Sequence, residues 1–462
     1  MSSTGLEKSL SKLYELFSEN GGVVTTDSRA VPTLSAPIFF ALKGDNFDGN
    51  DYAVQAVADG AVAAVVHDKL PKGVKTGSPE AERYFIVDDT LAALQELAAY
   101  HRDMLGLPLI ALTGSNGKTT TKELIARVLR TKYRVACTQG NLNNHIGVPL
   151  TLLSIKEEDD VAIVEMGANH QGEIAALCEI AAPNIGLITN VGRAHLEGFG
   201  GPEGVRKGKG ELFDYLTEHG GTAIYSADDP VLAEMVAERF TPDCTGVALG
   251  YDLSGYGVSA GMPAEGSDKL VLAMRDGTEV ATHMAGTYNL NNVAAALAVG
   301  DYFGITVQEA LEAVAAYEPD NNRSQVTVSG NGTGNTLYMD AYNANPSSMA
   351  AALDNFLALP FSGKKAVILG DMRELGDFSA AEHKGIVERL AAIAPQVMCF
   401  LVGPEFMKAL SAISPNDKNI RAFASAEALA EAINSGNVMI RDTHVLVKGS
   451  RGIALEKLYP LL

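Results

Sequence analysis

A short apolar run leads directly into a glycine loop and then into a helical pattern, and this order constrains the fold more than any other feature of the chain. Residues 109–113 are typical of a buried strand, residues 114–119 spell Gly-Ser-Asn-Gly-Lys-Thr, and residues 122–129 follow a helical pattern. Glycines let the backbone approach an anion closely, while backbone N–H groups and the helix dipole attract it. The segment therefore predicts a phosphate-binding loop after a sheet strand.

Two side chains of this loop have the chemistry that a nucleoside triphosphate requires. Lys118 can reach the β- and γ-phosphates, and the Thr119 hydroxyl can hold Mg²⁺. The loop is two residues shorter than the common Gly-x-x-x-x-Gly-Lys-Ser/Thr pattern, so it is a variant, and a plain glycine turn before a helix is the alternative. The predicted triphosphate-binding residues are Gly114, Ser115, Asn116, Gly117, Lys118, Thr119 and Thr120.

The rest of the chain alternates strand-like apolar runs with helical patterns, which indicates α/β layering throughout. A length of 462 residues suggests about three domains of ~150 residues each. We predict an α/β domain over residues 1–106, a central wound parallel sheet over 107–318, and a Rossmann-like domain over 319–462.

The predicted elements follow from these patterns. Strands are expected at residues 38–42, 61–66, 84–87, 109–113, 134–138, 161–166, 185–191, 223–225, 336–339, 366–369, 397–402 and 444–447, with a further β-rich region at 245–284. Helices are expected at residues 6–17, 91–101, 122–129, 290–302, 347–357, 380–393, 425–433 and 453–458.

The composition argues against several classes of partner. A net charge of −20 disfavours nucleic acid and anionic membranes. No apolar run reaches the ~20 residues of a membrane span, and the N-terminus lacks a basic region followed by an apolar core. The four scattered cysteines show neither metal-ligand spacing nor disulfide density, which indicates reduced thiols in a cytoplasmic protein.

Three residues of the central segment are candidates for chemistry. Glu165 ends an apolar strand, where a carboxylate can hold Mg²⁺ or a water molecule beside the phosphate loop. His195 follows the next strand and is either a ligand or a structural hydrogen-bonding group. Lys209 belongs to a basic cluster at residues 206–212 that is either functional or the solvated end of a helix.

Other polar residues lie at a helix start and in the last segment. Asn289 and Asn292 stand three apart, and they either cap the helix or read the edge of a base. Arg323 lies at the second linker, where a guanidinium could clamp phosphate across a domain gap. The loops at 370–376 and 448–452 each follow an apolar strand, and the second is cationic and suited to a carboxylate or phosphate.

The combination of motifs resembles the Mur ligase family. The matching segments cover all three predicted domains: residues 26–29, 40–44, 47–49, 113–120, 141–151, 340–349, 370–376 and 448–451. The resemblance implies an ATP-dependent amide ligase of peptidoglycan precursor synthesis that uses ATP and Mg²⁺ and acts as a monomer. The motifs fit the member whose substrates are a UDP-N-acetylmuramoyl-tripeptide and D-alanyl-D-alanine, joined through an acyl phosphate. A folylpolyglutamate synthetase-like ligase and a non-catalytic ATP-binding regulator are the alternatives.

The resemblance also implies a role for each matching residue. Lys118, His195 and Lys209 would be catalytic, and Mg²⁺ would be held by Thr119, Glu165, His195 and a carbamylated Lys209. Asn289 and Asn292 would contact adenine, while Arg323 and Asp340 would contact the phosphates and ribose of ATP. The remaining substrate contacts would be Ser28, Arg29, Lys43 and Gly44 for the uridine diphosphate, Asn143 and Asn144 for the muramyl region, and Asp371, Lys448, Ser450 and Arg451 for the dipeptide and acyl phosphate.

Overall fold

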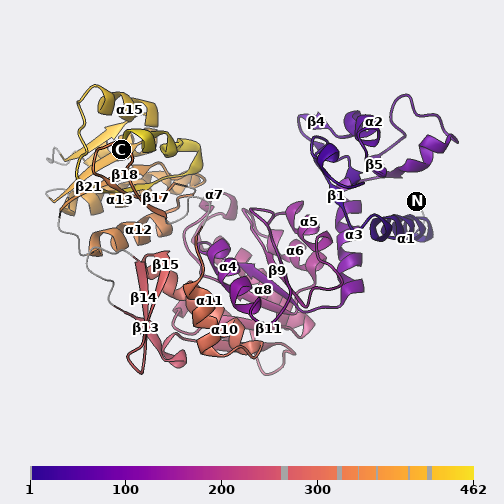
Figure 1. The fold of residues 1–462 in the computed structure, drawn as a ribbon, viewed down its shortest axis with the longest axis horizontal. Coiled ribbons are helices and arrows are strands. Elements are labelled where there is room, and N and C mark those ends of the chain that lie inside the picture. The colour runs from indigo at the N-terminus through magenta and orange to yellow at the C-terminus, as the bar shows by residue number, and fades with distance from the viewer. Residues whose placement is uncertain are drawn as a thin grey trace.

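The computed structural model describes residues 3–261, 269–319, 325–341, 343–359, 363–393, 396–413 and 419–462. Figure 1 shows three α/β regions in chain order, with the N-terminal and C-terminal regions on opposite sides of the central one. This arrangement confirms the predicted fold class of a central wound parallel sheet between two smaller α/β regions. Within the described residues, no helix combines the length and apolar character needed to cross a membrane.

The N-terminal region is built on a four-stranded parallel sheet in the order β1-β2-β5-β6. Its strands are β1 (Val24–Thr25), β2 (Ile38–Phe40), β5 (Ala63–His67) and β6 (Tyr84–Val87), with a small hairpin of β3 (Lys43–Gly44) and β4 (Phe47–Asp48). Its helices are α1 (Ser3–Glu19), α2 (Asn50–Ala58) and α3 (Thr90–Leu105), with short 3₁₀ turns at Val31–Thr33 and Pro79–Arg83.

Helix α3 joins the N-terminal region firmly to the central one. Asp89 caps its start by accepting from two backbone N–H groups, and Gly106 ends it in the left-handed conformation. The buried Arg102 donates to the carbonyl of Ala181 and to the side chain of Asn184 in the central region. Because a buried guanidinium needs such acceptors, α3 is fixed against the neighbouring helices rather than acting as a loose linker.

A buried histidine in the same helix makes this contact sensitive to pH. His101 Nε2 donates to the carbonyl of Ile155, so in the neutral ring Nδ1 accepts from the Tyr14 hydroxyl. Burial lowers the pKa of His101 below its ordinary value. The unfolded chain therefore binds this proton more readily, and the stabilisation that is complete above about pH 6.5 is lost as the pH falls through the folded pKa.

We expect the thermal midpoint of the wild-type protein to fall further between pH 7.5 and pH 5.5 than that of His101→Gln. Glutamine can still donate to the Ile155 carbonyl but cannot gain a proton, so the difference between the two slopes isolates this residue. Parallel slopes for the two proteins would contradict the assignment. Melting curves followed by circular dichroism at both pH values provide the measurement.

The central region contains a six-stranded parallel sheet in the order β12-β11-β10-β7-β9-β8. Its strands are β7 (Leu109–Thr113), β8 (Val135–Cys137), β9 (Val161–Glu165), β10 (Ile185–Ile188), β11 (Thr222–Ser226) and β12 (Val247–Tyr251). The strand order reverses at β7, which is buried along its whole length between β10 and β9. Ligands bind at such a switch point, outside the carboxyl ends of the strands.

Helices cover both faces of this sheet (Figure 1). They are α4 (Lys118–Leu129), α5 (Gly147–Leu153), α6 (Glu173–Ala181), α7 (Leu196–Phe199), α8 (Pro202–His219), α9 (Pro230–Arg239), α10 (Leu290–Tyr302) and α11 (Val307–Ala315). The predicted β-rich region at 245–284 is confirmed: after β12 it forms an antiparallel sheet of β13 (Val258–Ala260), β14 (Lys269–Met274) and β15 (Glu279–Ala285). Short 3₁₀ turns lie at Ser254–Tyr256 and Thr287–Asn289.

The C-terminal region has a six-stranded sheet in the order β16-β17-β21-β18-β19-β20, in which only β16 is antiparallel to its neighbour. Its strands are β16 (Gln325–Val328), β17 (Thr336–Asp340), β18 (Lys364–Gly370), β19 (Val397–Val402), β20 (Ile420–Phe423) and β21 (Thr443–Lys448). Its helices are α12 (Pro346–Ala358), α13 (Ser379–Ile393), α14 (Pro404–Ile413) and α15 (Ala426–Asn434), with a 3₁₀ turn at Gly376–Phe378.

One predicted helix of this region is wrong. Residues 453–458 belong to two 3₁₀ segments, Arg451–Ile453 and Leu455–Leu461, instead of one α-helix. Ala454 between them has a φ of 58°, a left-handed conformation that interrupts a right-handed helix. Pro460 lacks the backbone N–H that a continuing helix needs.

Candidate active site

A cavity of about 770 Å³ lies at the carboxyl ends of the central strands and is closed on one side by the C-terminal region. It gathers many of the predicted site residues, from segments far apart in the sequence. The predicted residues that line it are Ser115, Asn116, Gly117, Lys118, Thr119, Thr120, Asn143, Asn144, Glu165, His195, Asn289, Asn292, Asp340 and Lys448. Arg323 lies outside the described residues.

The phosphate loop is held in a shape that only glycines can adopt. Gly114 has a φ of 142°, and a Cβ there would lie 2.0 Å from the Thr189 hydroxyl. Gly117 has a φ of 78°, and its Cβ would lie 2.6 Å from Asn292 Oδ1. The ammonium of Lys118 crosses the loop and donates to the Gly114 carbonyl at 2.7 Å. The two glycines therefore let the loop pack closely against Thr189 and Asn292, and the Lys118 side chain lines the cavity.

Glu165 and Thr119 place two oxygen ligands side by side. Strand β9 pairs with β7 so that Glu165 stands opposite Leu112, just before the loop. The Thr119 hydroxyl donates to Glu165 Oε2 at 3.0 Å, and the Asn143 amide donates to Oε1 at 2.8 Å. Carboxylate and hydroxyl oxygens beside a phosphate site suit Mg²⁺, which commonly binds one or two protein ligands together with phosphate oxygens.

A separate metal cluster is not found among the described residues. Within that part of the chain, no group of three or more histidine, cysteine, aspartate or glutamate side chains could hold a metal ion. The Thr119 hydroxyl and the Glu165 carboxylate, 3.0 Å apart, are the two protein oxygens that could hold a cation beside the phosphate loop.

Lys209 is buried in the middle of the 18-residue helix α8, so the prediction of a solvated helix end is wrong. Its ammonium lies 3.4 Å from the Ala168 carbonyl and 5.1 Å above the Phe199 ring. A Cβ on Gly208 would come within 2.4 Å of that ring, so this glycine allows Phe199 to pack against the helix. Burial, with the nearby positive charge of Lys118, lowers the pKa of Lys209 to about 7.

His195 lies where the central region contacts the C-terminal region. Its Nδ1 is hydrogen-bonded to the carboxylate of Glu374, and the N–H of Glu197 donates to the Glu374 carbonyl at 3.2 Å. His195 and Glu374 both have a positive φ, 53° and 63°. The hydrogen bond from His195 lowers the pKa of the Glu374 carboxyl. The predicted metal ligand is therefore engaged by a carboxylate from the other region.

Asn289 and Asn292 form a hydrogen-bonded chain that leads to the phosphate-loop helix. Asn289 occupies the N-cap position of α10, but its amide donates to the Ala285 carbonyl and caps no helical N–H, so the capping alternative is wrong. Asn292 donates to Asn289 Oδ1 at 2.8 Å and accepts from the Thr121 hydroxyl at 3.0 Å. These buried amides brace α10 against α4 at the wall of the cavity.

Contacts from the C-terminal region close the cavity above the phosphate loop. The Asn345 amide donates to Asn116 Oδ1 at 2.7 Å, and the Arg193 guanidinium pairs with Glu382 at 2.6 Å. Asp340 and Lys448 end the paired strands β17 and β21 and form an ion pair at 2.6 Å. Groups from both regions therefore face the same space.

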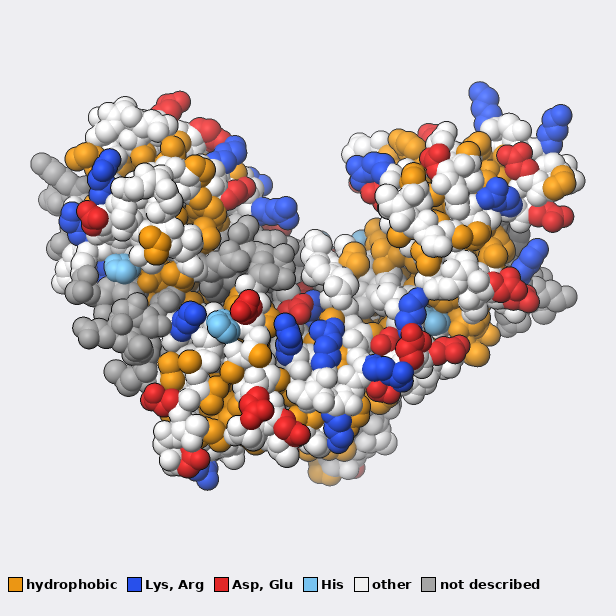
Figure 2. Space-filling model, in the orientation of Figure 1, with side chains coloured by type: hydrophobic (Ala, Val, Ile, Leu, Met, Phe, Trp, Pro, Cys, Tyr) orange, Lys and Arg blue, Asp and Glu red, His pale blue; other side chains and the backbone are white. Residues whose placement is uncertain are grey.

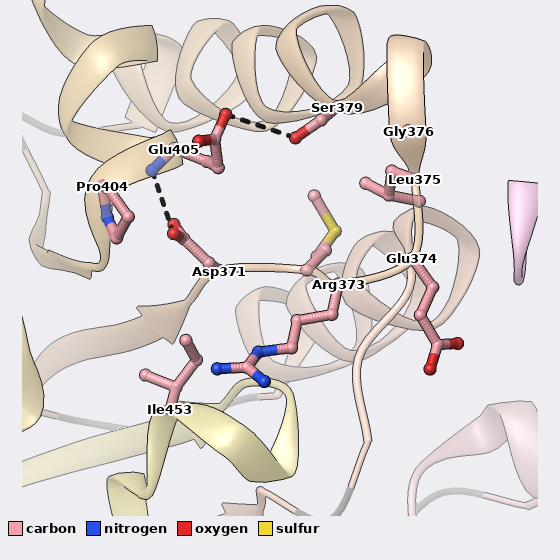
Figure 3. Close-up of a pocket in the computed structure, with 10 residues that line it drawn as sticks. Asp371, Arg373, Glu374, Leu375, Gly376, Ser379, Pro404, Glu405 and Ile453 are labelled. Carbon is pink, nitrogen blue, oxygen red and sulfur yellow. Dashed lines mark hydrogen bonds between the residues drawn. The ribbon is translucent and has the colours of Figure 1, made fainter. Parts of the chain in front are cut away.

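A second cavity of about 510 Å³ lies within the C-terminal region (Figure 3). The Asp371 carboxylate accepts from the N–H groups of Glu405 and Phe406 at 2.9 Å and so caps α14. Ser450 accepts from the N–H of Arg373 at 3.1 Å, which holds the loop in place. The exposed Arg451 lines neither cavity. Arg373 and Glu374, which belong to the predicted loop at 370–376 but were not named as site residues, also line this cavity.

The predicted uridine-side residues lie in the N-terminal region, outside both cavities. Arg29 pairs with Asp27 at 2.8 Å and its side chain is 88% exposed. Lys43 and Gly44 form β3, and the Phe47 ring of the same hairpin covers Gly44. Figure 2 shows a wide notch between the N-terminal and C-terminal regions, above the central one. A ligand that contacts both ends must extend across this notch.

Comparisons with known proteins agree with this architecture. Three family models match consecutive parts of the chain: the Mur ligase family, catalytic domain at residues 22–102; the Mur ligase middle domain at 112–300; and the Mur ligase, glutamate ligase domain at 322–451. A UDP-N-acetylmuramoyl-tripeptide–D-alanyl-D-alanine ligase from Bacillus subtilis is 36% identical over 440 residues, which cover 94% of this chain and 92% of the relative.

Solved structures show the same similarity. A crystal structure of MurF from Acinetobacter baumannii superposes with a TM-score of 0.79 at 32% identity, covering 94% of this chain and 92% of the other. MurF from Thermotoga maritima in complex with ADP gives a TM-score of 0.77 at 28% identity, covering 95% and 96%.

Proposed function

This chain belongs to the Mur ligase family, and we propose that it joins D-alanyl-D-alanine to UDP-N-acetylmuramoyl-tripeptide at the expense of ATP. The observation that carries the proposal is the shared cavity, in which the phosphate loop and Glu165 face Asp340 and Lys448 of the C-terminal region. The curated relative from B. subtilis has this activity as its name, and the T. maritima structure binds ADP. The name of the B. subtilis relative gives no support to the alternative of a folylpolyglutamate synthetase-like ligase.

In the first step, the terminal carboxylate of the tripeptide attacks the γ-phosphorus of ATP, and ADP leaves as an acyl phosphate forms. Two anions must meet, so the ammonium of Lys118 lowers the barrier by offsetting their repulsion. Thr119 and Glu165 would hold Mg²⁺, which supplies further positive charge at the triphosphate when it is bound. Asn116 and Asn345 close the cavity and limit the access of water to the acyl phosphate.

In the second step, the neutral amine of D-alanyl-D-alanine attacks the acyl carbonyl. The new C–N bond forms as the C–O bond to phosphate breaks, the amine loses a proton, and inorganic phosphate leaves. The amine must therefore reach the cavity from the side of the C-terminal region, whose loops form that wall. We propose that closure of this region onto the phosphate loop brings the two substrates together.

Lys209 is proposed to act as a carbamate. With a pKa of about 7, a large share of its amine is neutral near pH 7 and can attack CO₂, forming an N–C bond and releasing a proton. The product is an anion inside the protein, stabilised by the nearby charge of Lys118. His195, through Nε2, and this carbamate would together hold a second Mg²⁺, while Nδ1 keeps its hydrogen bond to the Glu374 carboxylate.

We further propose a cytoplasmic, monomeric enzyme that binds no nucleic acid. The net charge of −20 supports the last point, because a nucleic-acid-binding surface needs an excess of cations. The proposed substrates are a soluble nucleotide and a dipeptide, which the cytoplasm supplies.

Mass spectrometry of the reaction product tests the function directly. Purified protein should convert ATP, UDP-N-acetylmuramoyl-tripeptide and D-alanyl-D-alanine to the pentapeptide nucleotide, and ¹⁸O from the tripeptide carboxyl should appear in the released phosphate. Precursors that carry L-lysine or diaminopimelate at the third position, offered together, would also reveal the preferred peptide. Turnover with folate and glutamate but not with these substrates would overturn the assignment.

A further inference from the structure

Lys122 is a buried lysine that the reaction steps above do not use. It lies in α4, one helical turn after Thr119, and its side chain is 0% exposed. Its ammonium donates to the Thr138 carbonyl and pairs with Glu123 at 3.1 Å. An apolar side chain could fill the same space without the cost of burying a charge. The presence of a cation here therefore points to a task beyond packing.

Thr138, which directly follows β8, connects this lysine to Glu165. The Thr138 backbone N–H donates to the Ile163 carbonyl at 3.0 Å and so fixes the residue against β9. Its hydroxyl accepts from the backbone N–H of Glu165 at 2.9 Å. Thr138 therefore receives Lys122 through its carbonyl and holds the end of β9 through its hydroxyl. Thr138 and Lys122 are fully buried and Glu165 is 2% exposed, so solvent is kept away from these contacts.

The hydrogen bond between Thr119 and Glu165 closes these contacts into a ring. Thr119 and Lys122 stand on the same side of α4, because residues three apart in a helix are neighbours. The ring runs from α4 to the end of β8, then to the end of β9 and back to α4, whose position beside β9 is visible in Figure 1. It fixes the spacing of the Thr119 and Glu165 oxygens. Mg²⁺ is sensitive to that spacing, since it needs near-octahedral ligands at about 2.1 Å.

From this ring we infer that Lys122 is a positioning residue for the magnesium site: through Thr138 it holds Glu165 at the spacing from Thr119 that Mg²⁺ requires. The inference rests on the proposed function and deepens it, because it names a residue behind the proposed metal ligands that sets their geometry. A charged donor holds a carbonyl more firmly than a neutral one does. Lys122 also belongs to the helix that carries Lys118, so the phosphate loop and the carboxylate are tied into one unit.

Calorimetric titration of the full-length protein with ADP, with and without Mg²⁺, tests this inference without reference to activity. The dissociation constant without Mg²⁺ divided by that with Mg²⁺, here called the metal ratio, measures how much the metal contributes to binding. We expect Lys122→Met to lower the metal ratio about 10-fold, while the affinity for ADP alone stays within a factor of about three. Methionine is also unbranched and fills the buried space, but it has neither the charge nor the N–H donors.

Substitutions of Thr138 test the path from Lys122 to Glu165. Thr138→Val removes the hydroxyl that accepts from the Glu165 N–H, so it should lower the metal ratio as Lys122→Met does. Thr138→Ser keeps the hydroxyl and should lose less than Thr138→Val. The double variant Lys122→Met/Thr138→Val should lose little more than the larger of the two single losses, because both substitutions break the same ring.

Lys365→Met is the matched control for a merely structural role. Lys365 also donates to backbone carbonyls, those of Leu357 and Leu359 at 2.8 and 2.9 Å, but these contacts lie in the C-terminal region. Both lysine variants should lower the thermal midpoint, because each leaves carbonyls without their donor. Lys365→Met should leave the metal ratio at the wild-type value, whereas Lys122→Met should not.

The outcomes distinguish the inference from the function on which it rests. If the wild type forms product and binds ADP more tightly with Mg²⁺, but Lys122→Met keeps the same metal ratio, the inference is wrong. Additive losses in the double variant would contradict it as well. Should Lys122→Met not fold, the Thr138 pair decides, and a wild-type metal ratio for Thr138→Val overturns the inference. A wild type that binds no ADP or forms no product overturns the proposed function, and the inference with it.

Discussion

Lys118→Ala is expected to lower kcat/KM for ATP-dependent product formation by about 10³-fold, because it removes the cation at the point where two anions meet. In the structure this ammonium crosses the phosphate loop to the Gly114 carbonyl and lines the larger cavity. The lost charge acts in a partly closed space, where electrostatic interactions are stronger than in water. Phosphate release at saturating concentrations of both other substrates provides the measurement.

The control for this variant is Lys132→Ala. Lys132 is an exposed lysine of the same region, and it contacts the Gly304 carbonyl on the surface. Both variants lose one positive charge, so a general effect of net charge would appear in each. An Lys118→Ala enzyme that retains activity within a few-fold of the wild type would show that the predicted loop is not where the triphosphate reacts.

Lys209→Ala is expected to lower turnover by at least about 10²-fold, because the variant loses the proposed carbamate and with it an interaction that stabilises the transition state. Formate or acetate should restore part of the activity, because a small carboxylate can occupy the space left by the carbamate. Added bicarbonate should restore nothing in this variant, since no amine remains to react with CO₂. Lys207→Ala, an exposed neighbour on the same helix, should behave as the wild type.

The wild-type enzyme should depend on CO₂ in a pH-dependent manner. The neutral fraction of Lys209 rises with pH through its pKa of about 7, so at a constant concentration of dissolved CO₂ the CO₂-depleted enzyme should recover faster at pH 8 than at pH 6. A ¹³C NMR signal from bound ¹³CO₂, absent in Lys209→Ala, would identify the adduct without reference to activity. Full activity of Lys209→Ala would exclude the carbamate role.

Local patterns in the sequence predicted the parts of the site that depend on neighbours along the chain. The phosphate loop follows from strand, glycines and helix in a row, and β7 and α4 take these positions in the structure. Glu165 was singled out because it ends an apolar strand, and β9 does end there. The Mur ligase resemblance and the three-region α/β fold are confirmed by the family models and solved structures. The roles of the individual site residues remain predictions.

Patterns failed where a polar side chain finds its partner in a distant segment. Asn289 is of a residue type that often caps helices, and it stands at the position of a cap. In the structure, however, its side-chain NH₂ donates to the Ala285 carbonyl and its Oδ1 accepts from Asn292. The loop at 370–376 was predicted to carry chemistry, but its Arg373 and Glu374 were not named as site residues, because nothing near them in sequence indicates Gly452 or His195. These two contacts form only when the fold brings the loop at 370–376 next to Gly452 and His195.

The sequence alone determined where strands and helices alternate and where an anion can be bound, since both depend on residues within about a dozen positions of one another. The tertiary structure decided the burial of Lys209 and therefore its pKa. A run of basic residues and glycines is hydrophilic by composition, yet packing of α8 against Phe199 buries this one amine and lowers its pKa. Burial is a property of the whole fold, so it decides which of several similar lysines can do chemistry.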